Sequence, residues 1–574
     1  MTEELTVTTE RVDDIPILLM QAKKIGMPEL VDDHFPVHGN WEGTSLGWTA
    51  AVWLAHILTE GDHRMNQVQE WVAKRPHTLQ MSTGQAVRAL EWSDDRLRIV
   101  LDELSDNERW RGLERALNQQ TVRVYNLNAK LVRVDSTTAS GYWTVTEDGL
   151  FQFGHSKDHR PDLPQLKVML ATLDPLGMPL ATYVVSGERA DDRLYTPVIE
   201  QVRESLAECG LLYVGDCKMA AIGTRAAIQS HADYYLCPLS EMQMAPELLA
   251  SYLAPVWDEK QHLTPVTRAK PDGQVETIAK GYEQNVQLTH RVDDKVVTWR
   301  ERHLVIRSQQ QAKASTDGLH TRLLKAQAEL MRLTEPRQGK KRITDADTMQ
   351  AAVSSVLKRY RVDGLFKLSI TEKVNERSVR AHGKHPARIE IDRQVSLEVV
   401  VDERAVQETI RWFGWRVYAT NHPPQTLSLE QAVLAYREEY LVERSFGRLK
   451  GKPLSLTPMY LQSDTRATGL VRLLSLGLRI LTLIEHQVRK ELTDRQEKLA
   501  GLYAGNPKRT TPRPTAEALL TAFKDIYLSV VTFGDQQHRH VTPVSGLQRK
   551  ILSLLDFPVE IYSQLTGEFP GPAG

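Results

Sequence analysis

Two aspartates stand at the ends of predicted β-strands. Asp135 closes the apolar run LVRVD, and Asp216 closes the run LLYVGD. Hard cations such as Mg²⁺ prefer carboxylate oxygens and usually keep water or phosphate oxygens as their other ligands. Two such ions ~3.5–4 Å apart stabilise both the attacking and the leaving oxygen of a phosphoryl displacement. An aspartate after an apolar strand is also a common turn or cap residue, so the pair needs support from further carboxylates.

A third carboxylate, Glu443, lies on a long helix that the sequence predicts over about residues 429–450. Tyr436, Glu443 and Lys450 are spaced by seven residues, which returns them to one helix face within ~20°. A neighbouring stripe of the same helix holds Arg437, Arg444 and Arg448. Lysine and arginine bind phosphate, and a carboxylate between them suits a metal ion. The structural alternative is a solvated helix face on which the spacing arises by chance.

The elements that would position these side chains form a mixed α/β pattern. After residue 129 the order is strand, strand, strand, helix, strand, helix, strand, which is typical of a mixed sheet. The predicted strands are 131–135, 149–156, a hairpin over 166–185, 211–216 and 233–239. The sheet pattern stops near residue 240 and resumes at 409–421.

This pattern divides the chain into five predicted parts. They are an N-terminal helical domain over 1–128, the first part of an α/β core over 129–240, an α+β insertion over 241–405, the second part of the core over 406–504, and a basic linker with a helical C-terminal tail over 505–574. The last residues, 566–574, are predicted to be disordered.

Composition excludes several classes of protein. The chain has 574 residues, of which 41% are hydrophobic and 25% charged, with a net charge of −1. These values exclude bulk disorder and a polycation, but local basic patches can still bind nucleic acid. Cys209, Cys217 and Cys237 form no C-x-x-C pair, which argues against a disulfide framework or a cysteine zinc site and fits a reducing cytoplasm.

No membrane segment or signal peptide is expected. The acidic N-terminus lacks a basic region followed by an apolar one. Two apolar segments, Leu46–Leu58 and Leu470–Ile484, are too short or too charged to span a bilayer. We therefore predict that both are buried core helices.

Further basic residues are candidates for DNA contact. One short segment holds His155, Lys157, Asp158, His159 and Arg160. The stretch 331–361 carries eight basic residues against three acidic ones, and the linker 505–516 is also basic. Each of these has a structural alternative, which is a charged loop or a solvated helix face.

Several of these motifs together resemble those of bacterial insertion-sequence DDE transposases. The resemblance is to the group with a Tyr-Arg-Glu-Lys signature, in the branch with a large insertion before the catalytic Glu. It is carried by VRVDSTTASGYW (132–143), FGHSKDHRPDLPQLKVML (153–170), VGDCKM (214–219) and YREEYLVERSFGRLKGKPL (436–454), and it covers nearly the whole chain.

The resemblance implies an RNase H-like core in which Asp135, Asp216 and Glu443 are the catalytic residues and hold two Mg²⁺ ions, for which Mn²⁺ can substitute. Tyr436 and Lys450 match the Tyr and Lys of the signature. The Arg of the signature falls on Glu439, and Arg437 or Arg444 is a candidate replacement. By the same resemblance, Lys157, His159 and Arg160 would lie along DNA.

The implied activity is cut-and-paste transposition. The chain would bind the inverted-repeat ends of its element as a homodimer, cleave phosphodiester bonds there and join the 3′-OH ends to target DNA. The expected location is the bacterial cytoplasm, at the nucleoid. Two alternatives stay open, a catalytically inactive DNA-binding protein descended from a transposase and a nuclease that cuts branched DNA without strand transfer.

Overall fold

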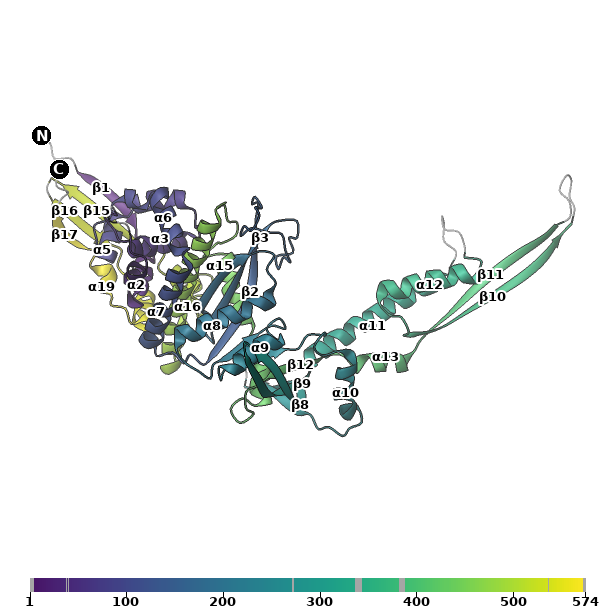
Figure 1. Cartoon of the computed structure of the whole chain (residues 1–574). Helices are drawn as coiled ribbons and strands as arrows, with labels where there is room; N and C mark the ends of the chain where they lie inside the picture. The colour runs from purple at the N-terminus through teal and green to yellow at the C-terminus, as the bar shows by residue number, and fades with distance from the viewer. Residues whose placement is uncertain are drawn as a thin grey trace.

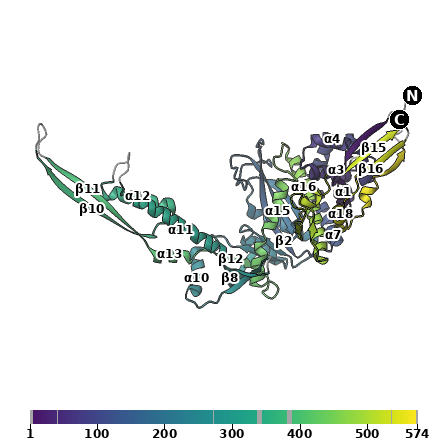
Figure 2. The same cartoon turned by 180° about the vertical axis from the view of Figure 1, so that it is seen from behind.

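The chain folds into a main body and a long arm (Figure 1). The computed structural model describes residues 5–37, 39, 41–270, 273–335, 343–380, 388–534 and 536–570. The two ends of the chain lie side by side on the body, on the side away from the arm. The view from behind shows the same separation of arm and body (Figure 2).

The helices of the first part of the chain pack against one another, and several of them contact one long buried helix, α16 (Asp464–Asp494). They are α1 (Ile15–Lys24), α2 (Met27–His34), α3 (Leu46–Glu60), α4 (Val68–Ala73), α5 (Pro76–Thr83), α6 (Asp94–Leu104) and α7 (Asn107–Tyr125), with 3₁₀ turns η1 (Met65–Gln67) and η2 (Ala89–Trp92). Among the described residues α16 is the one helix long and apolar enough to cross a membrane, but 94% of its most apolar window is buried inside the protein. The prediction of two buried core helices, now α3 and α16, is confirmed.

A nine-stranded mixed sheet lies beside these helices, in the order β4-β3-β2-β5-β6-β12-β9-β8-β7. Its strands are β2 (Leu131–Ser140), β3 (Gln165–Leu173), β4 (Met178–Ser186), β5 (Leu212–Gly215), β6 (Tyr234–Pro238), β7 (Thr264–Ala269), β8 (Val275–Val292), β9 (Lys295–Ser308) and β12 (Trp415–Thr420). Strands β2, β5 and β6 are parallel, whereas β3 and β4 run antiparallel to their neighbours. The connecting elements are η3 (Asp191–Leu194), α8 (Tyr195–Leu206) and α9 (Ile222–Ser230).

The sheet confirms the mixed α/β prediction but differs from it at two places. It continues beyond residue 240, because β9 pairs with β12 and brings β8 and β7 into the same sheet. The predicted strand at 149–156 is wrong, since only Gln152 forms an isolated bridge, to Gln165. Gly149 and Gly154 stand in that segment, and glycine disfavours regular strands.

The arm is built from two helices and a two-stranded ribbon. Its elements are α11 (Gln309–Met331), α12 (Ala346–Tyr360), β10 (Phe366–Val379), β11 (Arg388–Val401) and α13 (Glu403–Ile410), and α10 (Pro246–Trp257) lies at its base (Figure 1). Apolar residues of the ribbon pack against α11 and α12 in a core separate from that of the body. Part of the predicted basic stretch, residues 336–342, lies outside the described residues.

The sequence predicted a helical C-terminal tail, but the structure shows both helices and strands in this region. Helices α17 (Ala516–Thr521), α18 (Gly546–Leu555) and α19 (Glu560–Ser563) are joined by strands β15 (Tyr527–Phe533), β16 (Gln536–Val541) and β17 (Gly567–Pro570). These strands form a sheet with β1 (Thr6–Arg11), and the short strands β13 (Leu499–Ala500) and β14 (Thr510–Thr511) pair separately. β-Branched residues in β15 favour a strand. Of the tail predicted to be disordered, 567–570 is a strand, and 571–574 lies outside the described residues.

The single helix predicted over 429–450 is wrong, because the structure divides it into α14 (Leu429–Arg437) and α15 (Tyr440–Lys450). The amides of Glu438 and Glu439 bond to carbonyls three residues back, which is 3₁₀-type pairing. This tighter turn changes the direction in which the side chains of α15 point relative to those of α14. Tyr436 and Glu443 therefore do not share one continuous helix face.

A buried histidine in α3 makes the stability of the helical region depend on pH. His56 is 2% exposed, and its ring lies edge-on to that of Trp71 at 5.4 Å. Burial lowers the pKa of His56 to about 4, although the charge of Glu60 acts in the opposite direction. Between its unfolded and folded pKa values, the unfolded chain binds a proton that the folded chain does not.

We expect stability to fall as the pH falls from 7 to 5, with about 2 kcal/mol of the loss due to this histidine. Chemical unfolding at the two pH values, on the wild type and on His56→Leu, measures that share. The variant should lose about 2 kcal/mol less than the wild type between the two conditions. Equal losses in both proteins would show that His56 titrates normally in the folded state.

Candidate functional site

Asp135 and Asp216 lie side by side on the neighbouring parallel strands β2 and β5. Asp216 directly follows β5, whereas the strand that was predicted to end at Asp135 continues to Ser140. Val134 of β2 is in register with Gly215 of β5, so the aspartate that follows each of them reaches the same level of the sheet. Paired residues on neighbouring strands point to the same face of the sheet. Both aspartates also line one narrow cavity, together with Tyr436 and Glu439. The predicted meeting of the two aspartates therefore follows from the register of the sheet.

Asp216 is held by two donors. The hydroxyl of Tyr195 donates to its Oδ1 at 2.6 Å, and the backbone N–H of Lys218 donates to the same oxygen at 2.8 Å. Burial raises the pKa of Tyr195 well above its ordinary value, and the nearby charges of Asp216 and Asp135 act in the same direction. The hydroxyl therefore stays protonated and remains a donor to the carboxylate.

Asp135 is neutralised by Lys157. The Nζ of Lys157 lies 3.3 Å from Asp135 Oδ1, donates to the carbonyl of Ser136 at 2.7 Å and lies 3.5 Å from Asp191 Oδ2. Burial raises the pKa of Asp135, and the Lys157 charge acts against that rise. The pKa of Lys157 is raised because the surrounding carboxylates outweigh its own burial. A lysine ammonium thus lies beside Asp135 and balances its charge.

Glu439 faces the two aspartates, whereas the predicted third carboxylate, Glu443, is exposed one turn further along α15. Burial raises the pKa of Glu439, and the charges of Asp135 and Glu443 raise it further. A hydrogen bond from the hydroxyl of Tyr436 acts in the opposite direction. Within the described part of the chain, no three or more His, Cys, Asp or Glu side chains are grouped as a ready metal site.

Tyr436 is buried, and its ring packs against that of Tyr418 at 4.7 Å between centroids. Lys450 forms an ion pair with Asp158, and its Nζ lies 3.3 Å from the carbonyl oxygen of Thr138 on β2. The end of α15 is therefore attached to the same strand that carries Asp135.

The three arginines of the predicted helix stripe have partners inside the protein. Arg437 donates to the carbonyl of Ile278 at 3.3 Å and to Ser308 Oγ at 3.1 Å. Arg444 forms a two-point ion pair with Glu485 of α16, which is 4% exposed. Arg448 donates to Glu485 at 2.6 Å and to Glu517 of α17 at 2.6 Å. Their predicted contact with phosphate stays a prediction.

The segment rich in charged residues forms a loop between β2 and β3. His159 has a φ of +57°, and Arg160 pairs with Asp162 at 2.8 Å across the exposed surface. Among the charged residues of that segment, Lys157 contacts Asp135 and Asp158 contacts Lys450. The structure therefore brings Lys157 to the aspartates but leaves His159 and Arg160 on the outside.

Sequence reasoning missed the roles of two residues around the aspartates, namely Tyr195 and Asp191. Asp191 is the start of the 3₁₀ turn before α8, and it contacts Lys157 and Lys167. Burial alone would raise the pKa of Asp191, but its contacts with Lys167, Lys157 and Ser136 together lower it. The sequence marks Asp191 only as a helix start and gives no signal for Tyr195. Both residues contact side chains that are distant from them in the sequence, Lys157 and Asp216 respectively.

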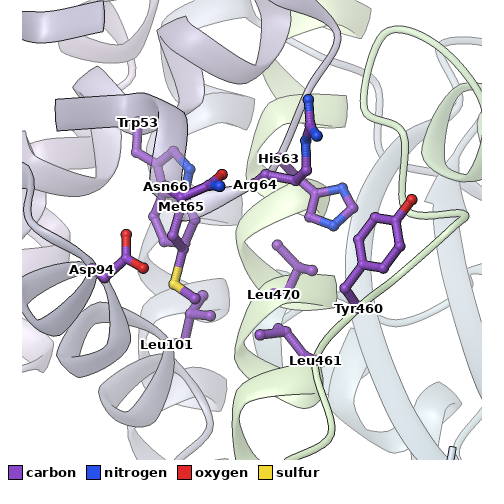
Figure 3. A pocket seen from close by; sticks show the side chains of 10 residues that line it. All are labelled: Trp53, His63, Arg64, Met65, Asn66, Asp94, Leu101, Tyr460, Leu461 and Leu470. Atoms are coloured by element: carbon purple, nitrogen blue, oxygen red, sulfur yellow. The ribbon is translucent and has the colours of Figure 1, made fainter. Parts of the chain in front are cut away.

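A larger cavity of about 580 Å³ lies elsewhere, between the N-terminal helices and α16. Figure 3 shows Trp53, Met65 and Asn66 on one side of it and His63 and Tyr460 on the other. The aspartates do not line this cavity.

Comparison with known proteins gives no family. No family model matches the sequence, and no curated protein matches it. Among solved structures, the chain is similar to one described as a cryo-EM structure of a piggyBac transposase synaptic complex with hairpin DNA. The identity is 7% and the TM-score 0.34, over 88% of this chain and 79% of that one. A likeness of this size does not establish a common fold, so the geometry above has to carry any functional proposal.

The ion pairs of α15 predict that Arg444→Ala lowers thermal stability, because it leaves part of the buried Glu485 charge uncompensated. Removing one partner of a buried ion pair costs roughly 3 kcal/mol. Melting curves measure this loss, and Arg98→Ala, which removes an exposed arginine paired with Asp95 on α6, is the matched control. A salt titration of DNA binding should give the wild-type slope for Arg444→Ala. A lower slope with unchanged melting would instead place Arg444 on phosphate.

Proposed function

We propose that the chain is a metal-dependent DNA transposase with an RNase H-like core. It would bind the inverted-repeat ends of its insertion sequence, hydrolyse phosphodiester bonds there and join the 3′-OH ends to target DNA. The proposal combines the resemblance of the sequence motifs to DDE transposases with the geometry of the Asp135–Asp216 pair.

The observation that carries the proposal is the register between β2 and β5, which puts two carboxylates next to each other at one sheet edge. Half of the sheet follows the order β4-β3-β2-β5-β6, with three antiparallel strands followed by two that run parallel to β2. This order is the one we expect for an RNase H-like core. Two adjacent carboxylates at low exposure are unfavourable without a cation, so the pair has the character of a binding site rather than of a stable core.

The residues present fit a hard divalent cation by their chemistry, because all candidate donors are oxygen atoms. Asp135 and Asp216 would hold the metal, with Glu443 as the third carboxylate by resemblance and Glu439 facing the pair from the turn before it. When bound, such ions activate the attacking water and stabilise the leaving oxygen. Because Lys157 is bonded to Asp135, the aspartate would bind a metal ion only after the Lys157 ammonium moves away.

The chain's own residues would then act as follows. The Tyr195 hydroxyl holds one oxygen of Asp216 and leaves the other free to coordinate. Lys157, once displaced, keeps its contact with Asp191 and offers its ammonium to a phosphate oxygen. Lys450, now paired with Asp158, can exchange that carboxylate for the phosphate of a DNA strand. Tyr436 positions Glu439 through its hydrogen bond.

The proposed partners are double-stranded DNA, both as element ends and as target, and a second copy of the chain within the DNA complex. The test is an assay of cleavage and joining with a duplex that carries the inverted repeat flanking the gene. In Mg²⁺ we expect nicking at the end of the repeat and transfer of the 3′-OH end into a plasmid, and neither product in EDTA.

Asp135→Ala should abolish nicking yet leave binding of the duplex within a few-fold of the wild type, because lysine and arginine contacts to phosphate supply most of the affinity. Gel shifts and nicking assays on the same DNA measure the two effects. The matched control is Asp192→Ala, which removes an exposed aspartate in the 3₁₀ turn η3.

Three outcomes contradict the proposal in different ways. Nicking by Asp135→Ala near the wild-type rate would remove the aspartate from the mechanism. Binding without any cleavage by the wild type would indicate an inactive DNA-binding protein. Cleavage of branched DNA without joining would indicate a nuclease.

A further inference from the structure

A site of this kind needs positively charged side chains to bind the DNA phosphates, in addition to the charge of the metal ion. Asp135, Asp216 and Glu439 are all acidic, and a phosphodiester adds another negative charge. Arg437, Arg444 and Arg448 are bound to partners within the protein. An arginine whose guanidinium is still open to a ligand must therefore come from another element.

Arg416 of β12 lies at the same edge of the sheet as the two aspartates. Val214 of β5 is in register with Leu236 of β6, and Pro238 of β6 is in register with Tyr418 of β12. Asp216 comes two residues after Val214, and Pro238 comes two residues after Leu236. Asp216, Pro238 and Tyr418 are therefore level with one another on three neighbouring strand positions. Because strands are ~4.8 Å apart, the backbone of Tyr418 lies ~10 Å from that of Asp216.

The side chain of Arg416 projects from the same face of the sheet as Tyr418, because side chains alternate along a strand. Tyr418 packs against Tyr436, which lines the cavity with Asp216 and Glu439. Because β12 runs antiparallel to β6, Arg416, two residues before Tyr418, lies beyond Pro238, the last residue of β6. It thus stands at the open side of the carboxylate site.

The guanidinium of Arg416 is exposed, and no hydrogen bond or ion pair engages it within the residues that the structure describes. An arginine with no internal partner beside an acidic cavity is available for an anionic ligand.

We propose that Arg416 binds a phosphate of the DNA strand that enters the Asp135–Asp216 site. This proposal rests on the proposed function and adds to it the residue that holds the DNA backbone there. The planar guanidinium can make two parallel hydrogen bonds to one phosphate, which fixes its orientation as well as its position. Arg416 would thereby place the phosphodiester against the two aspartates from the β12 side.

The first test measures the salt dependence of binding to a short DNA duplex of random sequence, without divalent metal. Loss of one phosphate contact lowers the slope of log K against log salt by ~0.9. We expect this drop for Arg416→Ala and the wild-type slope for Arg416→Lys, which keeps the charge. The matched control is Arg268→Ala, because Arg268 is an exposed arginine on β7, at the far edge of the same sheet. Its slope should equal that of the wild type.

The second test measures cleavage of the inverted-repeat duplex in Mg²⁺. We expect a loss of about 10²-fold for Arg416→Ala, as for removal of a donor that stabilises the reacting group. Arg416→Lys should retain intermediate activity, because a lysine provides charge without the two-point geometry. Melting curves check that the variants are folded, which is expected for an exposed side chain.

An unchanged slope for Arg416→Ala, or an equal drop for Arg268→Ala, would overturn the inference. Its failure is distinguishable from failure of the proposed function. A wild type that cleaves DNA together with an Arg416→Ala variant that cleaves and binds equally well would refute only the role of Arg416. A wild type that cleaves no DNA in Mg²⁺ or Mn²⁺ would refute the proposed function, whereas the salt slopes would still decide whether Arg416 contacts phosphate.

Discussion

The structure of the site depends on the repulsion between two carboxylates that the parallel pairing of β2 and β5 forces together. Asp135, within β2, and Asp216, directly after β5, stand at the same level of adjacent strands, and their positions are fixed by the register. The protein offsets this repulsion with one ammonium, that of Lys157, and one hydroxyl donor, that of Tyr195. Both compensating groups come from outside the two strands, so the loop after β2 and the start of α8 are part of the site.

The second requirement is a fixed position for the helices that bring further carboxylates to this edge. Buried ion pairs fix the position of α15. Glu485 of α16 forms ion pairs with Arg444 and Arg448 of α15, and Arg448 also forms one with Glu517. Lys450 attaches the last turn of α15 to the strand of Asp135. The buried helix α16 thus orients α15, and the 3₁₀ turn between α14 and α15 decides which glutamate faces the aspartates.

The sequence is informative where the structure depends on local pattern. The apolar runs before Asp135 and Asp216 predict two strands that end in carboxylates. The structure has both strands, but only the second ends at its aspartate, because β2 continues past Asp135 to Ser140. Register between them cannot be derived from the runs alone, since it is set by pairing across 81 residues of chain (216 − 135). The break before Tyr440 was also beyond prediction, because every residue around it is compatible with a helix. Arg444 and Arg448 looked free because their partner Glu485 lies on another helix. The resumption of the sheet at 409–421 was predicted and corresponds to β12, whereas the membership of β7, β8 and β9 in the same sheet was not predicted.

The central claim is that the Asp135–Asp216 pair binds a divalent metal ion and that Lys157 moves away from Asp135 when the ion binds. The most direct measurement is anomalous scattering from crystals of the full chain soaked in Mn²⁺. The account predicts a manganese peak in contact with carboxylate oxygens of both Asp135 and Asp216, with the Lys157 ammonium moved away from Asp135. A fully soaked crystal with no peak between the two aspartates, and with Lys157 still bonded to Asp135, would contradict it.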